Sequence, residues 1–482
     1  MATPSLKKNI SLSMAYQILT LITPFITTPY IARVLGADGV GVASYTSSVA
    51  SLFMLFAALG TSSYGTIEIA KVRNDFEKRS QTFWEIETLA ILSTLAVLVV
   101  WGGFVWMNKQ YQLYFLILTL SLLYVPFDVN WFFAGIEEFR YIVYRNFFVK
   151  ILGIVLLFVF IRDKDDLGLY LFIQGITYLL GLASMWFYLK GRVRRPKVKF
   201  SNMPHHFRET LIFFVPTIAT SVYCLLDKTL IGVITDNAFE NGYYEQATKM
   251  STMVKTVTFS ALNSVMMSRQ SFLFAEGKLD EMKQRIDRSV DIIMFIGVGA
   301  CLGVIGIAST FVPLFFGQGY DPVIFLMQLL IPVVLFSGIG DCLGSQYYNP
   351  SGLRAKSARY IIAGAVLNLI CNLLLIPRLG SVGAVIGTLI AEFFIACLYV
   401  YNCNKFLRLS QILGKIWKRL IAGCCMLAVI ALIRRLEMAS ILKLLIECAG
   451  GFLTYIAVLF LMRDTLLDYL IKDVIYPRFQ RN

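Results

Sequence analysis

Long apolar stretches follow one another from near residue 10 to near residue 462. Each stretch is roughly 18–26 residues long, which is the length of helix that crosses the ~30 Å hydrocarbon core of a bilayer. Short polar segments separate them, so fourteen candidate spans can be assigned. Their approximate limits are 10–32, 40–66, 86–107, 112–134, 141–161, 167–189, 210–234, 242–267, 290–315, 321–347, 358–376, 381–403, 416–433 and 440–462.

The composition agrees with a bilayer as the solvent. Of the 482 residues, 57% are hydrophobic and 15% are charged, whereas a soluble domain carries about 25% charged residues. The nine cysteines lie mostly inside apolar stretches and have no metal-binding spacing, so they are interpreted as small hydrophobic residues. We therefore predict an all-α integral membrane protein with about fourteen transmembrane helices and no metal site.

The distribution of Lys and Arg predicts the topology. With the N-terminus in the cytoplasm, 32 of the 44 basic residues fall in cytoplasmic segments, 7 in outer segments and 5 within spans. Cytoplasmic loops of membrane proteins carry such an excess, so both termini are predicted to be cytoplasmic. The net charge of +14 is thereby interpreted as a topology signal and not as a nucleic-acid surface.

A basic cytoplasmic linker, 191–209, divides the predicted spans into two sets. Six spans lie in 1–190, six lie in 210–405, and 406–482 holds two further helices and a cytoplasmic tail. The halves resemble each other weakly at "NWFFAGIEEFRY" (130–141) and "SQYYNPSGLRAKSARY" (345–360). Two halves with an even number of spans share one orientation. This is the parallel-repeat arrangement of transporters, whose substrate site lies near mid-membrane between the repeats.

Catalytic motifs are missing from the sequence. There is no GxxxxGK[ST] phosphate loop and no GxSxG motif. The two histidines, His205 and His206, are adjacent in the basic linker and are expected to be loop residues. No outer segment is long enough to hold the acceptor of a glycan polymerase. We predict that the protein is not an enzyme and has no catalytic residues.

Charged residues within the spans are the candidate functional residues, because a charge at the bilayer centre costs about 2.5–3.5 kcal/mol. The cations suit an anionic ligand, and the anions are candidates for ion coupling or for structural pairs. The cations are Arg33, Lys150, Lys228, Lys249 and Lys255, and the anions are Asp128, Asp227, Asp341 and Glu392. Two alternatives stay open: Arg33 and Asp341 could extend to the membrane surface, and Asp227 or Lys228 could pair with a neighbouring span.

The first span also contains Pro24 and Pro29. Proline removes a backbone hydrogen bond and kinks a helix, so this span is predicted to bend beside water.

Several segments together resemble the polysaccharide transporter family. This family comprises the O-antigen and capsule repeat-unit flippases of the multidrug/oligosaccharidyl-lipid/polysaccharide exporter superfamily. The resemblance is carried by "TPYIARVLGADGVGVASY" (28–45), "DVNWFFAGIEEFRYI" (128–142), "LLDKTLIG" (225–232), "NGYYEQATKM" (241–250) and "NLLLIPRLGSVGAVIGTLIAE" (372–392).

The resemblance implies two six-helix bundles that face each other as a V, plus two C-terminal helices. The implied function is a flippase of the bacterial plasma membrane. Such a flippase moves an undecaprenyl-pyrophosphate-linked oligosaccharide from the inner to the outer leaflet by alternating access. Arg33 and Lys249 match family motifs for cavity-lining cations. Lys249 stands where the related lipid II flippases usually have Arg, so it offers a point charge without a bidentate fork. Lys150, Lys228 and Lys255 are proposed from charge alone.

The expected partners are the lipid-linked oligosaccharide, membrane lipids, and a glycan polymerase and glycosyltransferases. No cofactor is expected, but a coupling ion, H+ or Na+, is. Polar residues expected to meet sugar hydroxyls are Asn130, Gln174, Asn263, Asn368 and Asn372.

The alternative is a cation-coupled multidrug exporter of the same superfamily, which would need an acidic cavity for cationic drugs. A membrane-embedded glycan polymerase or acyltransferase is a third hypothesis. The short outer segments and the absence of a histidine within a span oppose it.

Overall fold

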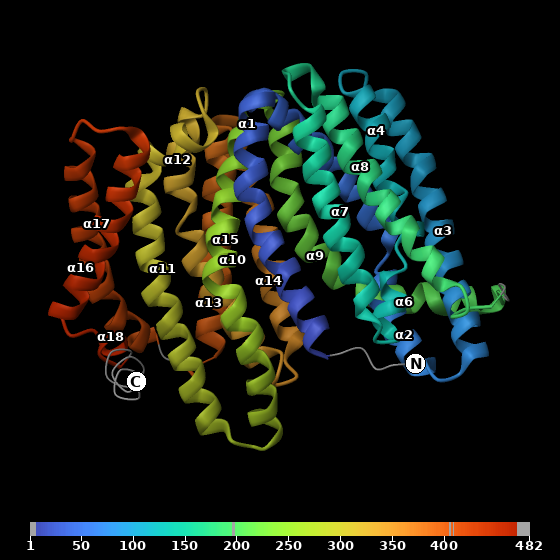
Figure 1. Cartoon of the computed structure of the whole chain (residues 1–482). Coiled ribbons are helices and arrows are strands. Elements are labelled where there is room, and N and C mark those ends of the chain that lie inside the picture. The colour runs from blue at the N-terminus through green and yellow to red at the C-terminus, as the bar shows by residue number, and fades with distance from the viewer. Residues whose placement is uncertain (1–5, 195–197, 404–405, 408, 470–482) are drawn as a thin grey trace. The chain divides into compact units, whose positions relative to one another are not determined.

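The computed structural model describes residues 6–194, 198–403, 406–407 and 409–469 (Figure 1). These residues form helices joined by short connections, with one isolated β-bridge between Lys190 and Val193. The α-helices are α1 (Leu6–Ala58), α2 (Thr61–Val72), α3 (Phe76–Met107), α4 (Gln112–Leu122), α5 (Tyr124–Phe127), α6 (Asn130–Gly135), α7 (Phe139–Phe160), α8 (Leu167–Ser184), α9 (Met203–Thr235), α10 (Ala238–Ala275), α11 (Leu279–Phe316), α12 (Asp321–Leu330), α13 (Val333–Leu343), α14 (Arg354–Leu379), α15 (Ser381–Asn402), α16 (Leu409–Arg434), α17 (Ser440–Leu461) and α18 (Thr465–Tyr469).

Four short elements complete the description. The 3-10 helices are η1 (Lys164–Asp166), η2 (Met185–Leu189) and η3 (Phe200–Asn202), and the π-helix is η4 (Gly344–Tyr348). The predicted all-α class is confirmed. The chain termini, which were predicted to be cytoplasmic, lie outside the described residues.

The contacts within the chain define two compact units, Met1–Gly242 and Tyr243–Asn482. The N-terminal unit holds α1 to α9 and the first residues of α10. The C-terminal unit holds the rest of α10 and α11 to α18. The domain limits expected at residues 190, 209 and 405 remain predictions.

Helix α1 consists of two membrane-length segments. Its 53 residues would form a straight helix about 80 Å long, more than twice the thickness of the hydrocarbon core. Gly36 interrupts the helical backbone with φ 72° and ψ 175°, a conformation that glycine adopts readily because it lacks a Cβ. Pro24 and Pro29 lie in the first segment, where the backbone keeps helical dihedral angles. The break in α1 is therefore at the glycine and not at the prolines.

Two aromatic clusters hold the N-terminal unit together. In the first, the ring of Trp101 on α3 lies 5.5 Å from that of Phe115 on α4 and 5.0 Å from that of Phe53 on α1. In the second, Phe83 on α3 stacks on Trp131 of α6 with 5.4 Å between ring centroids. Buried aromatic pairs of this kind add roughly 0.5–1.5 kcal/mol beyond their apolar area. Together these contacts hold α3 against α1, α4 and α6.

A buried ionic cluster connects three elements of the C-terminal unit. Arg419 on α16 is fully buried, and its Nη2 donates a hydrogen bond of 2.6 Å to Oδ1 of Asp291 on α11. Its Nε donates a 3.3 Å hydrogen bond to Oδ2 of Asp464, which precedes α18. A charge can be buried in this way because each ion has a partner with hydrogen-bonding geometry. The cluster joins α16 to the rest of this unit.

Eleven helical segments among the described residues are long and apolar enough to span a membrane. The first of them, Tyr16–Val72, contains the break at Gly36. Large apolar side chains such as Val99, Trp106 and Phe148 are strongly exposed on the helices, as expected of residues that face lipid. The protein is therefore an integral membrane protein with many spans, and the total of fourteen remains a prediction.

Candidate substrate cavity

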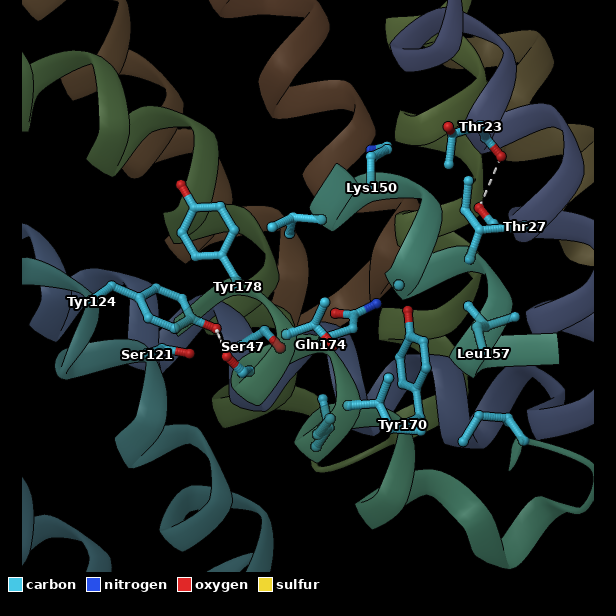
Figure 2. Close-up of a pocket in the computed structure, with 18 of the residues that line it drawn as sticks. Thr23, Thr27, Ser47, Ser121, Tyr124, Lys150, Leu157, Tyr170, Gln174 and Tyr178 are labelled. Carbon is cyan, nitrogen blue, oxygen red and sulfur yellow. Dashed lines mark hydrogen bonds between the residues drawn. The ribbon is translucent and has the colours of Figure 1, made fainter. Parts of the chain in front are cut away.

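The N-terminal unit encloses a cavity of about 550 Å³ between α1, α4, α5, α7 and α8 (Figure 2). Both segments of α1 contribute to its wall, with Thr23 and Thr27 from the first and Ser47 and Ser51 from the second. The packing of α1 against α4, α7 and α8 keeps these helices side by side. The cavity thus belongs to a single compact unit.

Hydroxyl groups and aromatic rings dominate the lining. Figure 2 shows Gln174 between Tyr178 and Tyr170, with Lys150 nearby on α7. The polar lining residues are four tyrosines (Tyr16, Tyr124, Tyr170 and Tyr178), six serines and threonines (Thr23, Thr27, Ser47, Ser51, Ser121 and Thr177), two amides (Asn146 and Gln174) and Lys150. No carboxylate is among the described residues that line the cavity. The lining therefore offers many neutral hydrogen-bonding groups and one positive charge.

Several of these hydroxyls already have a hydrogen bond that fixes their position. The hydroxyl of Thr27 donates to the carbonyl of Thr23 at 3.0 Å, and that of Tyr124 donates to the carbonyl of Gly175 at 3.1 Å. Their oxygen lone pairs can still accept from a ligand. The Thr177 hydroxyl is buried and has no hydrogen-bond partner among the described residues. A ligand hydroxyl in this cavity would find both donors and acceptors.

Lys150 is the cation of the cavity. Its side chain is half-buried, and no carboxylate of the described residues lies within ion-pair distance of its ammonium group. A partly buried ammonium without a counter-charge is costly, and a bound anion would stabilise it. The cavity is therefore suited to a ligand that combines hydroxyl groups with negative charge.

The other predicted cations do not line this cavity. Arg33 is exposed on α1, and Lys228 is partly buried on α9. In the C-terminal unit, Lys249 lies 3.1 Å from Oε1 of Glu245, one helical turn earlier, and Lys255 lies 2.9 Å from Oδ2 of Asp341. An anion at Lys249 or Lys255 would compete with these carboxylates.

The predicted anions have different surroundings. Asp128 follows α5, and its Oδ1 accepts a 3.0 Å hydrogen bond from the backbone N–H of Asn130. Asp227 is buried on α9, and Glu392 is partly buried on α15. Asp341 is exposed and forms the ion pair with Lys255. Whether it acts in ion coupling or as a structural partner remains a prediction.

Of the polar residues expected to meet sugar hydroxyls, Gln174 lines the cavity. The others hydrogen-bond to protein groups. Asn130 Oδ1 accepts from Arg145 at 3.2 Å. In the C-terminal unit, Asn263 Oδ1 accepts from Gln346 at 3.2 Å, and Asn372 donates to Asn368 at 3.0 Å.

Residues 6–267 match the family model described as polysaccharide biosynthesis protein. The matched region covers more than half of the chain. This chain belongs to the polysaccharide biosynthesis protein family.

Relatives and solved structures agree with this membership. The chain is 21% identical over 419 residues to a putative O-antigen transporter of Escherichia coli (strain K12), covering 85% of this chain and 98% of that protein. Its fold is similar to that of the lipid II flippase MurJ in an inward closed conformation, with a TM-score of 0.62, 14% identity, and coverage of 95% and 99%. It is also similar to an inward-facing multidrug resistance MATE family transporter, with a TM-score of 0.62, 14% identity, and coverage of 88% and 98%.

Glycines within the motifs that carry the family resemblance lie where helices of this chain pack closely. A Cβ added to Gly41 would lie 1.7 Å from the carbonyl oxygen of Ala238, and one added to Gly242 would lie 1.9 Å from that of Ala37. Likewise, a Cβ on Gly232 would lie 2.1 Å from the ring of Tyr45. Helix α1 therefore meets the start of α10 backbone to backbone, and the ring of Tyr45 packs directly on α9 at Gly232, so these positions have no space for a Cβ.

Two groups of residues in the N-terminal unit escaped the sequence interpretation. His206 was expected in a loop, but it lies in α9 and is buried, with Nε2 2.9 Å from Oε2 of Glu85. Glu87 on α3 and Arg145 on α7 are also buried. They lie close to the assigned span ends at 86 and 141, where charged residues are usually in contact with water. A position near the end of a predicted span does not show whether neighbouring helices bury the side chain.

A second, apolar cavity of about 380 Å³ lies between α11, α16 and α17 of the C-terminal unit. Its wall contains small residues, Gly299, Gly303 and Gly451 among them. The exposed side chains of Ile296 and Phe452 are also part of this wall. Its described lining is mostly apolar apart from the buried Glu447, a composition that suits a hydrocarbon chain.

Proposed function

We propose that this protein is a flippase that moves an undecaprenyl-pyrophosphate-linked oligosaccharide from the cytoplasmic to the outer leaflet of the bacterial inner membrane by alternating access. The observation that carries the proposal is the cavity of the N-terminal unit, which combines a half-buried Lys150 with hydroxyls, amides and tyrosine rings and has no carboxylate among its described lining residues. Membership of a polysaccharide biosynthesis protein family and the similarity to a putative O-antigen transporter support it.

The sugars of the substrate bind in this cavity in the proposed mechanism. Sugar hydroxyls exchange hydrogen bonds with polar lining residues such as Gln174 and Tyr170. The apolar faces of the sugar rings pack on tyrosine rings such as Tyr170. Because neutral hydrogen bonds contribute only about 0.5–1.5 kcal/mol each, several together hold a sugar without trapping it. This suits a transporter, which must also release its substrate.

The diphosphate is the part of the substrate that cannot cross hydrocarbon unaided. Lys150 provides it with a positive charge, and we propose that Arg33, Lys228, Lys249 and Lys255 contact it at other stages of transport. Lys249 and Lys255 exchange their carboxylate partners for phosphate oxygens in doing so. The prenyl chain stays in lipid, and the apolar cavity between α11, α16 and α17 can hold part of it.

The substrate of the proposed flippase determines which enzymes act before and after transport. Glycosyltransferases that build the oligosaccharide on the inner leaflet supply it, and a polymerase on the outer face consumes it. Both chain termini lie in the cytoplasm in this scheme. A cation-coupled multidrug exporter is the second candidate, but a cavity that contains an ammonium group and no carboxylate among its described lining residues opposes cationic drugs.

A flipping assay in reconstituted vesicles tests the proposal. Lys150→Ala should lower the transport rate of a prenyl-diphosphate-linked oligosaccharide roughly 10- to 100-fold, because a charge-assisted contact is worth about 1.5–3 kcal/mol. Lys150→Arg should retain most of the rate. Lys356→Ala, which removes an exposed lysine of α14, is the matched control and should transport normally. Full transport by Lys150→Ala, or transport of cationic dyes in place of the glycan lipid, would contradict the proposal.

A further inference from the structure

A carboxyl group with no hydrogen-bond partner is buried in the N-terminal unit. Glu87 lies on α3, about 16 Å along the helix from its start, and its side chain is fully buried. Neither of its carboxyl oxygens has a hydrogen-bond partner among the described residues. An ionised carboxylate in such a place would lack both water and donors, which is costly enough to favour the neutral acid.

Glu85, two residues earlier on the same helix, shows the contrast. It accepts hydrogen bonds from Asn202 at 3.0 Å and Gln81 at 2.8 Å and lies 2.9 Å from Nε2 of His206. Two residues apart on a helix means about 200° of rotation, so Glu87 points to nearly the opposite side of α3. The donors that satisfy Glu85 cannot serve Glu87.

Helix α5, which Asp128 follows, packs against α3, and the charge of Asp128 acts electrostatically on Glu87. Asp128 and Arg145 of α7 share Asn130 as a partner: its backbone N–H donates to Asp128 Oδ1 at 3.0 Å, and its Oδ1 accepts from Arg145 at 3.2 Å. Arg145 is buried, and its Nε has no hydrogen-bond partner among the described residues. The guanidinium carbon of Arg145 lies 6.0 Å from the ring centre of Tyr178, a residue of the cavity wall. A chain of polar groups therefore runs from inside α3 to the candidate substrate cavity.

The titratable groups around this chain come from several helices. Tyr16 of α1 and Tyr178 of α8 act on Arg145, and Asp128 follows α5. On the other side of α3, His206 of α9 binds Glu85, and Glu68, Glu85 and Glu209 act on Tyr64 of α2. With one proton on the Glu87–Asp128 pair and a positive Arg145, the buried cluster is neutral. Loss of that proton would leave a net negative charge in a region of low dielectric constant, which is costly.

We propose that Glu87 and Asp128 form a proton-binding pair that couples transport to a proton gradient. The proton comes from water in the cavity and adds to a carboxylate oxygen of the pair, and its release to water reverses this step. Helix α7 makes the connection, because it carries both Lys150 at the cavity and Arg145 beside Asp128. An anion that binds Lys150 and shifts α7 changes the contact between Arg145 and Asp128. Proton affinity and substrate affinity then influence each other reciprocally.

This inference rests on the proposed flippase function for its coupling role, but the proton site can be tested separately. Infrared difference spectra of the purified protein in lipid, recorded between low and high pH, should contain the carbonyl band of a protonated carboxylic acid. The band should be lost in Glu87→Gln and changed in Asp128→Asn. Glu68→Gln, which removes an ion-paired carboxylate of α2, is the matched control and should leave the band unchanged. Persistence of the full band in Glu87→Gln would overturn the proton site.

Coupling is tested in sodium-free vesicles with and without a pH gradient. The gradient should raise the flipping rate of the wild-type protein roughly tenfold, a typical size for coupling between two sites, and should have no effect on Glu87→Gln. If Glu87→Gln does not fold, Asp128→Asn serves the same test. In parallel vesicles that contain sodium, a flipping rate that depends on the sodium gradient and not on the pH gradient would overturn the proposal. A band that depends on Glu87 in a protein that flips no glycan lipid would support the proton site and contradict the flippase function.

Discussion

The hydroxyl of Tyr64 lies 2.7 Å from Nδ1 of His206, a residue 142 positions later in the chain. Glu85 binds the other ring nitrogen of the same histidine. These contacts join α2, α3 and α9 at three buried polar side chains. A buried network of this kind stabilises a fold only when all its members have partners.

We therefore expect His206→Ala to destabilise the protein by about 1–3 kcal/mol, because Tyr64 loses its partner while it remains buried. The measurement is the thermal unfolding midpoint in detergent. His205→Ala is the matched control, since His205 is exposed next to His206, and it should leave the midpoint unchanged. Equal midpoints for the two variants would show that the network contributes nothing.

The backbone contact at Gly41 gives a second prediction. Gly41→Ala should destabilise the protein by at least about 3 kcal/mol, because the new Cβ would collide with the carbonyl of Ala238 and backbone atoms cannot give way as a side chain does. Gly102→Ala is the control: Gly102 lies in α3, and no heavy atom lies within 4 Å of an added Cβ. Gly102→Ala should stabilise the protein by about 0.5–1 kcal/mol, because alanine favours the helical conformation more than glycine does. Thermal midpoints that move in opposite directions would confirm both expectations.

The sequence predicted the membrane fold well because a bilayer requires long apolar helices, and these are visible as runs of residues. The segment "TPYIARVLGADGVGVASY" was one of five that indicated the family, and its Gly41 lies where α1 meets the start of α10 backbone to backbone. The break in α1 at Gly36 falls between the predicted spans 10–32 and 40–66, and the bend expected at the prolines stays a prediction. Prolines weaken a helix locally, yet Pro24 and Pro29 are accommodated in helical backbone, whereas Gly36 adopts the conformation that other residues avoid.

The candidate site was less accessible to sequence reasoning. Lys150 was found from its charge within a span, but the tyrosines, serines and threonines of the cavity come from four other helices, and the sequence does not show which sides of these helices face one another. Glu87 was missed for a related reason. It stands near the edge of an apolar run, where solvent contact is the usual expectation, and the packing of neighbouring helices against α3 buries it.

We expect the buried ionic cluster around Arg419 to be essential for holding α16 against α11 and the segment before α18. Arg419→Ala would leave the buried Asp464 without its guanidinium partner, and removal of one member of a buried ion pair costs about 3–5 kcal/mol. Arg419→Met should be less harmful than Arg419→Ala, because it fills the space. Limited proteolysis of the connection between α15 and α16, together with the unfolding midpoint, measures this. If Lys418→Ala, at a neighbouring and more exposed lysine of α16, were equally destabilising, the special role of Arg419 would be refuted.

Variants of Lys255 and Asp341 can distinguish a role in substrate binding from a role in stabilising the fold. Both side chains are partly exposed, 36% for Lys255 and 54% for Asp341, and exposed ion pairs contribute only about 0–1 kcal/mol. Neither Lys255→Ala nor Asp341→Ala should shift the unfolding midpoint appreciably. If Lys255 contacts the diphosphate, Lys255→Ala should lower the flipping rate more than Asp341→Ala, and the double variant should behave like Lys255→Ala alone. Equal losses from both single variants would instead assign the pair a structural role, because each variant would then abolish the same contact.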